Sequence, residues 1–295
     1  MSTENEAVKI TPEAAAPAGT PLFSMFLRSF FIQAGWNYER YQNLGFAFTL
    51  EPALRKIYPD AEKFKAAMLR HMQIFNTQPY LASFVLGNVV RIEERAAAGE
   101  ADLKNLPGMK QALASSFASI GDRIFWGRLK PMTTQICLLV WAAGGFFGWL
   151  FTGAQQELSA SLLLAGPLAG ISFYSAFAVY WRWKGLGAGY ACGGSSNCAL
   201  DAFNWSRLIR LLSAAGFMMS VAIVLLAVWL LVGANRADLR TPGLLLRLGL
   251  PLAVLVLHRV ARAFGRSVFF AAGVVLAVSL FLFSALKLEP FRLYL

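Results

Sequence analysis

The sequence is poor in the residues that most enzymes and metal sites need. Its only histidines are His71 and His258, and its only cysteines are Cys137, Cys192 and Cys198. Neither histidine stands in a recognisable catalytic motif, and the cysteines lack the neighbouring histidines of a zinc site. Three cysteines give no disulfide framework, so we expect reduced thiols. These absences argue against a stand-alone enzyme and predict neither a metal nor a cofactor.

Acidic charge is also scarce, but only in the second half. Residues 131–295 contain 12 Lys and Arg but 4 Asp and Glu, whereas residues 1–130 contain 15 and 12. No basic cluster is dense enough to follow a nucleic-acid backbone, so we expect no nucleic-acid partner. A basic surplus beside apolar runs is typical of membrane topology. The overall composition, 57% hydrophobic and 15% charged, fits this interpretation.

A secretory signal is also missing from the first residues. Residues 1–20 contain Glu4, Glu6 and Glu13 among Ala, Pro and Thr and have no apolar core. This composition predicts a disordered cytoplasmic tail.

Long uncharged runs are what the second half does have. Five of them can cross a membrane: 132–156, 158–181, 211–235, 267–286 and, with its flanks, the shorter 248–257. Glycine pairs at 144/148 and 166/170 suit close helix contacts. The basic loops 182–210 and 258–266 are expected inside, and the turn 151–158, without Lys or Arg, outside. We therefore predict an all-α polytopic membrane protein with about five transmembrane helices in 131–295 and a cytoplasmic N-terminus.

Residues 28–50 carry an unusual mixture of amides, aromatics and few charges. Read as one helix, the segment has two neighbouring polar stripes and an apolar, aromatic stripe on the far side. The first polar stripe contains Gln33, Asn37 and Arg40; the second contains Trp36, Glu39 and Asn43. Such a face is typical of a sugar-contacting surface or a tightly packed polar interface. A polar helix–helix contact within a membrane protein is the alternative.

The rest of residues 21–130 is predicted to form amphipathic and broken helices. Asp60 can cap a helix that starts at residue 61. Pro79 interrupts the uncharged stretch 71–90, which predicts two half-helices meeting at a polar, re-entrant break. The alternative is a soluble helix, a turn and a second buried helix. A polar connector is expected at 91–110, and a tight structure at the membrane edge is expected at 121–131.

Three segments in this region resemble the IID component of the mannose/fructose/sorbose family of the bacterial phosphotransferase system. They contain GWNYER at 35–40, FNTQP at 75–79 and GDRIFWG at 121–127, in order, within a match over roughly 25–131. Beyond residue 131 only the hydrophobic pattern and Gly189-Tyr190 are similar. Arg123 and Arg128 depart from the GDPIFWGT that is usual in the family, and residues 191–205 lack its charged segment.

The resemblance implies a subunit of the bacterial inner membrane that pairs with a IIC membrane subunit, as a trimer of pairs. IIA and IIB phosphocarrier proteins would phosphorylate the hexose, and this chain would carry no phosphohistidine. The candidate residues for sugar or IIC contacts are Gln33, Trp36, Asn37, Glu39, Arg40, Asn76, Thr77, Gln78, Asp122 and Trp126.

Two functional hypotheses follow. The first is a transport subunit for phosphorylation-coupled uptake of a hexose; the second is a non-transporting scaffold or regulatory subunit that keeps the IIC-binding surface. The polar motifs favour transport. Arg123 and Arg128 favour the scaffold if they fill the cavity, or else they bind a sugar phosphate or an anionic membrane lipid.

Overall fold

The computed structural model describes residues 19–152, 159–193 and 196–234, and the single positions 256, 259, 260, 263, 273, 274 and 277. The described residues are helical, with two isolated bridges and no extended sheet ladder. Residues up to Ile223 form one compact unit, and Val224 begins a second. The predictions for spans 248–257 and 267–286, and nearly all of the tail 1–20, fall outside the described residues. Of that tail, Thr20 donates a hydrogen bond to Glu94.

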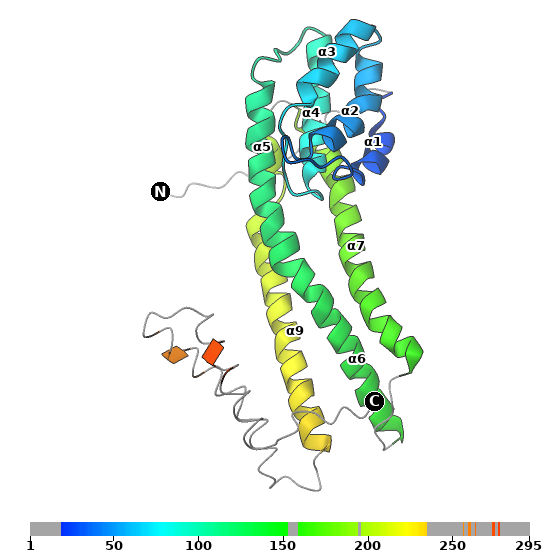
Figure 1. Ribbon diagram of the computed structural model, residues 1–295, viewed down its shortest axis with the longest axis vertical. Coiled ribbons are helices and arrows are strands. Elements are labelled where there is room, and N and C mark those ends of the chain that lie inside the picture. The colour runs from blue at the N-terminus through cyan, green and yellow to red at the C-terminus, as the bar shows by residue number, and fades with distance from the viewer. Residues whose placement is uncertain are drawn as a thin grey trace, which may run out of the picture. The chain divides into compact units, whose positions relative to one another are not determined.

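Four helices form a cluster at one end of the first unit (Figure 1). They are α1 (Leu22–Ser29), α2 (Asn43–Ile57), α3 (Ala61–His71) and α4 (Ala82–Ala97). The predicted cap of α3 is present, because the Asp60 carboxylate accepts a hydrogen bond of 3.0 Å from the Lys63 amide. The helix is interrupted around Pro79, but residues 72–81 are not helical, so the half-helix predicted before the proline is absent. The arrangement is the alternative one: a helix (α3), a turn and a second, buried helix (α4). The helix α4 extends into the expected connector, which is reduced to residues 98–105.

The prediction of a tight structure at 121–131 is wrong. Helix α5 (Leu106–Gly121) continues through a π-helical segment, η1 (Asp122–Leu129), into α6 (Lys130–Thr152). Pro131 is the second residue of α6 and has no amide hydrogen to donate to a residue one turn back. A locally widened helix accommodates such a proline without breaking the rod.

Helix α7 (Ala160–Ala191) runs back beside α6 (Figure 1). It continues beyond residue 181, where the uncharged run 158–181 ends. The predicted loop 182–210 is therefore wrong at both ends, since α7 continues to Ala191 and α9 (Trp205–Ala234) begins before residue 210. The last three turns of α7 are helical because they pack against α4, where glycines let the backbones meet. Added Cβ atoms on Gly87 and Gly189 would overlap the backbone of the facing helix.

The connection between α7 and α9 also corrects the cysteine prediction. Cys192 and Cys198 form a disulfide that joins the end of α7 to the short helix α8 (Ser196–Asp201). Their Cα atoms are 5.5 Å apart, within reach of such a bond. The expectation of reduced thiols is wrong for this pair, because the spacing of two cysteines in the sequence does not show how close they lie in the fold. Cys137 is a free cysteine.

Among the residues that the structure describes, two helices are long and apolar enough to cross a membrane: Ala160–Ala191 and the stretch Cys198–Ala227, which contains most of α9. Helix α6 runs alongside α7, and the predicted close contact at Gly170 is present, because a Cβ there would meet the Thr133 carbonyl. The all-helical fold is thus confirmed, whereas the described residues support two clear apolar spans rather than five.

Candidate functional site

The stretch 28–50 is not one helix. Helix α1 ends at Ser29 and α2 begins at Asn43, with a folded loop between them that we call the motif loop, residues 30–42. The chain reverses in this loop, with Tyr41 at a positive φ of 57°. The reversal brings Gly45 against the Ile32 carbonyl, where any side chain would overlap the backbone. The helical stripes predicted for the segment are wrong, because residues 30–42 are not part of a helix. A 3.6-residue periodicity cannot reveal the contact between Gly45 and Ile32.

Asn37 holds the motif loop together. Its side-chain Nδ2 donates to the Asn43 Oδ1 at 2.9 Å and to the Gly35 carbonyl at 3.2 Å, while its Oδ1 accepts from the Arg40 amide at 2.8 Å. Its backbone exchanges two hydrogen bonds with Tyr41. Asn37 is half-buried, and its side-chain amide forms its hydrogen bonds within the motif loop and with Asn43.

The second motif lies beside the motif loop. The Gln42 side chain forms a pair of hydrogen bonds with the Thr77 backbone, of 2.8 and 3.1 Å, and the Asn43 amide donates to the Met72 carbonyl at 2.8 Å. Tyr41 also bridges to Phe75. Gln42 and Asn43 were not among the predicted site residues, although both belong to the same amide-rich segment. Their role is to join the two motifs.

The third motif contacts the second through packed side chains. Gly121 lies against the Gln78 side chain, and a Cβ at Gly121 would overlap it. The Tyr80 and Phe125 rings are 4.6 Å apart between centroids. Thr77 and Gln78 are buried at this junction, and the Thr77 hydroxyl donates to the Ala114 carbonyl. The three sequence motifs are thus parts of one continuous structure.

The predicted site residues divide by exposure. One group is open to the surface: Gln33, Trp36, Glu39, Arg40, Asn76, Asp122 and Trp126. The other group, Asn37, Thr77 and Gln78, is partly or fully buried, and its side chains form hydrogen bonds with Asn43, the Ala114 carbonyl and the Tyr80 amide. Within the described residues, neither Asp122 nor Glu39 forms an ion pair. The exposed group is free to contact a ligand or a partner, and the buried group holds it in place.

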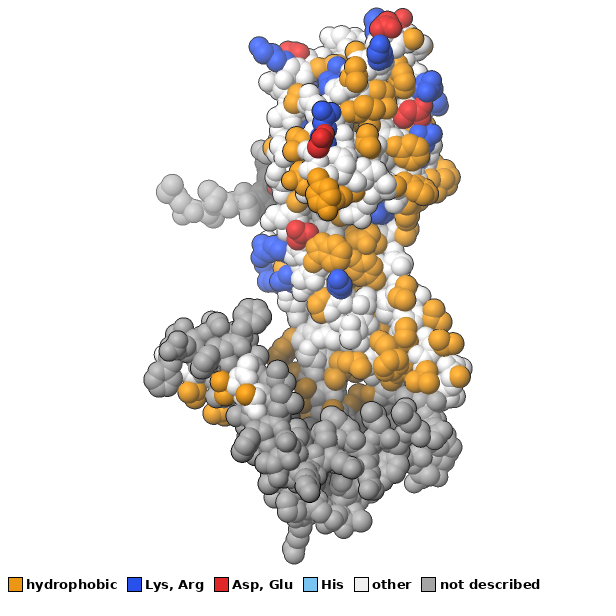
Figure 2. All heavy atoms as spheres, in the orientation of Figure 1, with side chains coloured by type: hydrophobic (Ala, Val, Ile, Leu, Met, Phe, Trp, Pro, Cys, Tyr) orange, Lys and Arg blue, Asp and Glu red, His pale blue; other side chains and the backbone are white. Residues whose placement is uncertain are grey.

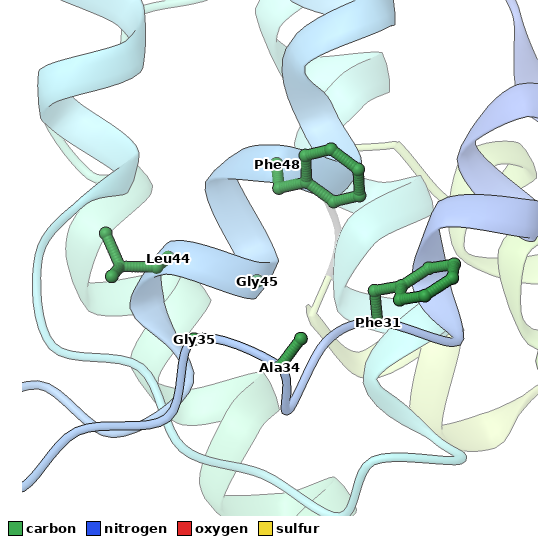
Figure 3. A pocket seen from close by; sticks show the side chains of 6 residues that line it. All are labelled: Phe31, Ala34, Gly35, Leu44, Gly45 and Phe48. Atoms are coloured by element: carbon green, nitrogen blue, oxygen red, sulfur yellow. The ribbon is translucent and has the colours of Figure 1, made fainter.

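An apolar pocket of about 370 Å³ opens where the motif loop meets α2. Figure 3 shows the Phe31 and Phe48 rings on one side and Leu44 on the other, with Ala34, Gly35 and Gly45 between them. The two rings meet edge to face at 6.4 Å. At the rim, the Arg28 guanidinium lies 4.6 Å from the centre of the Phe48 ring and pairs with Glu51. Such a lining suits an apolar side chain better than a sugar.

Helix α4 also contains a buried carboxylate, that of Glu93. Glu93 accepts hydrogen bonds from Arg70, His71 and Tyr58, all between 2.8 and 2.9 Å. Burial alone would raise the pKa of Glu93, but the hydrogen bonds from His71 and Arg70 outweigh it and lower the pKa to about 2. Burial lowers the pKa of His71, so the neutral ring donates from Nε2 to an ionised Glu93.

His71 and Lys110 are therefore parts of the fold. His71 is fully buried, and its Nε2 is engaged by Glu93. Lys110 is also buried, with its Nζ 5.2 Å from the centre of the Phe46 ring, and burial lowers the pKa of its amine to about 8. A phosphocarrier protein cannot reach an imidazole enclosed in this way, so His71 is a structural residue.

Sequence and structure comparisons agree with this arrangement. A family model described as "PTS system mannose/fructose/sorbose family IID component" matches residues 20–233. The mannose-specific EIID component of Escherichia coli K12 is 39% identical over 171 residues, which cover 57% of this chain and 54% of that protein. The sorbose-specific EIID component of Klebsiella pneumoniae is 32% identical over 224 residues, covering 75% and 74%.

A solved structure described as that of a membrane protein is similar in fold, with a TM-score of 0.53 and 34% identity, covering 69% of this chain and 68% of the other. The described residues thus form a helical fold with two apolar spans and three joined motifs. The chain belongs to the mannose/fructose/sorbose family of IID components. The matched region spans about half the length of the Escherichia coli relative.

Proposed function

We propose that this chain is the IID subunit of a permease that, with a IIC subunit, moves a hexose of the mannose, fructose or sorbose type across the bacterial inner membrane. IIA and IIB proteins phosphorylate the sugar as it is released inside. The observation that carries the proposal is the joining of the three family motifs into one continuous structure, through Gln42–Thr77 and Gly121–Gln78. A protein that needed only an anchor in the membrane would not require so specific a polar arrangement.

In this proposal the exposed residues contact the sugar or IIC, and the buried residues hold the motif loop in place. The exposed carboxylate of Glu39, the guanidinium of Arg40 and the amides of Gln33 and Asn76 can bond to sugar hydroxyls, and the Trp36 ring can stack on a pyranose. The apolar pocket beside Phe48 receives a side chain of the IIC subunit. Asn37, Thr77 and Gln78 position the motif loop. Asp122 and Trp126 are exposed on η1 and provide further contacts for the sugar or for IIC.

The proposal includes a membrane arrangement. Five transmembrane helices with a cytoplasmic N-terminus agree with the uncharged runs and with the surplus of basic residues in segments 182–210 and 258–266. The pairs of IID and IIC assemble as a trimer. The alternative is a non-transporting scaffold, which Arg123 and Arg128 would favour if they filled the sugar cavity. Arg128 instead bonds to Ser213 of α9, which favours transport.

The test is phosphoenolpyruvate-dependent sugar phosphorylation in membranes that contain the organism's own IIA, IIB and IIC proteins, with and without this chain, over a panel of hexoses. We expect phosphorylation of at least one hexose only when the chain is present. Membranes in which IIC co-purifies with the chain but no hexose is phosphorylated would support the scaffold. Equal phosphorylation without the chain would contradict the transport role, and failure of IIC to co-purify would contradict the scaffold as well.

A further inference from the structure

A second cavity lies away from the motif surface, between η1, α6 and α9. Its volume is about 280 Å³, and four polar side chains line it: Arg128, Gln135, Ser213 and Ser220. Gly127, Pro131 and Gly216 leave the space open, and Met132 and Leu212 form its apolar walls. We call it the η1–α9 groove. The proposed transport mechanism does not use it.

The groove offers positive charge that no described side chain neutralises. Arg128 donates from Nε to the Ser213 hydroxyl at 2.7 Å and from Nη1 to the Arg123 carbonyl at 2.6 Å. These two bonds aim the guanidinium across the groove and leave its Nη2 without a hydrogen bond among the described residues. Within that part of the chain, Arg128 also has no carboxylate within ion-pair distance. A positioned, unpaired guanidinium is suited to bind a phosphate.

The groove also contains an acceptor that lacks a donor. Gln135 donates from Nε2 to the Ser220 hydroxyl at 2.7 Å and to the Gly216 carbonyl at 3.2 Å, which fixes its orientation. Its Oε1 is buried and accepts no hydrogen bond from the described residues. Both serine hydroxyls donate to carbonyls of their own helix, so neither can supply the missing hydrogen. A ligand that fits both groups carries a negative charge and a hydroxyl donor.

The position of the groove indicates a lipid. In α6, charged residues end at Lys130, and in α9 they end at Arg210. Figure 2 shows charged side chains over the N-terminal helices and at the level where α5 passes into α6, and none on the described part of that face below it. The Lys130 Nζ lies 5.0 Å from the centre of the Trp126 ring, a pairing typical of the membrane interface. On α9, Phe217 lies one residue beyond Gly216 and is 71% exposed, available to an acyl chain.

We propose that the η1–α9 groove binds the headgroup of an anionic glycerophospholipid with free hydroxyls, of the phosphatidylglycerol type. The phosphate accepts hydrogen bonds from Arg128, the glycerol hydroxyl donates to Gln135 Oε1, and the acyl chains follow the apolar face of α9. Arg123, Arg207 and Arg210 lie on the same elements and add attraction for the anionic surface. The inference is independent of the sugar that the transporter carries.

The test uses the full chain, purified and delipidated in detergent, with thermal unfolding followed as phosphatidylglycerol is added. We expect a saturable rise of the unfolding midpoint that phosphatidylethanolamine does not reproduce. Arg128→Gln should raise the half-saturating lipid concentration at least about tenfold, because it removes a charge-assisted hydrogen bond of about 1.5 kcal/mol or more. Arg207→Gln removes the same charge outside the groove and should raise that concentration less than about fivefold, the effect of diffuse attraction alone.

Three more measurements separate a lipid site from diffuse charge attraction and from a site for a free anion. Gln135→Glu should also weaken the response, and it tests the groove if Arg128→Gln does not fold. Inorganic phosphate and glycerol 3-phosphate should neither raise the midpoint nor compete with the lipid. An equal loss in Arg128→Gln and Arg207→Gln would show diffuse charge attraction and overturn the proposal. A response to soluble phosphate that depends on Arg128 would also overturn it, because the ligand would then be a free anion.

Discussion

Gly189→Ala is expected to destabilise the protein, and Gly187→Ala, two residues away on the same helix, is not. The Cβ of an alanine at position 189 would overlap the Phe84 carbonyl of α4. Backbone atoms cannot rotate away as a side chain can, so α4 and α7 would have to separate. We expect a loss of about 3 kcal/mol in the free energy of unfolding, at the upper end for an overpacked site.

Gly187 provides the matched control for this prediction. It is exposed, and nothing lies within 4 Å of a Cβ placed there. Alanine is the better helix former by about 1 kcal/mol, so Gly187→Ala should leave the protein unchanged or slightly stabilised. Thermal unfolding of both variants in detergent measures the difference. Equal midpoints would contradict the close crossing of α4 and α7.

The second large effect is expected at Glu93. Glu93→Gln keeps the shape of the side chain but removes the negative charge to which Arg70, His71 and Tyr58 donate hydrogen bonds. Loss of one partner from a buried ion pair leaves the other uncompensated, and we expect a cost of about 3 kcal/mol. Glu51→Gln is the control, because Glu51 pairs with Arg28 and Arg55 near the surface, where such pairs contribute less than about 1 kcal/mol.

The Glu93 effect should also depend on pH. The pKa of this carboxyl is about 2 in the folded protein, below its ordinary value, so ionised Glu93 stabilises the fold. Its contribution is fully present above the unfolded pKa, at about 4.5, and is lost as the pH falls through the folded pKa. The gap between wild type and Glu93→Gln should therefore be constant near pH 7 and shrink below pH ~4. A gap that does not change with pH would contradict an ionised Glu93.

The sequence predicted local features well where the signal lies within one or two helical turns. The Asp60 cap depends on a carboxylate three residues before an amide, and it is present. The interruption around Pro79 is present too, although the preceding helix already ends at His71. The small residues at Gly166 and Gly170 meet α6 as expected for closely packed helices.

Features that depend on distant contacts were not predicted. The motif loop reverses because Gly45 packs on the Ile32 carbonyl, and α7 extends past its apolar run because Gly189 packs on Phe84. Neither partner is visible in a helical periodicity, and the glycines at 185–189 had no assigned role. The same limit applies to Asn37: its residue type suggested a ligand contact, but its bonds to Gly35 and Asn43 are within the loop.

The most direct test of the account is the rate of phosphoenolpyruvate-dependent sugar phosphorylation by the Glu39→Gln variant. The control is Glu62→Gln, which alters an exposed carboxylate on α3, outside the motif loop. Both variants should unfold at the wild-type temperature and co-purify with IIC. We expect Glu39→Gln to lose at least about tenfold in rate, since a charge-assisted hydrogen bond contributes about 1.5–3 kcal/mol, and Glu62→Gln to be unaffected. A normal rate in Glu39→Gln would contradict a working role for the exposed motif surface in transport.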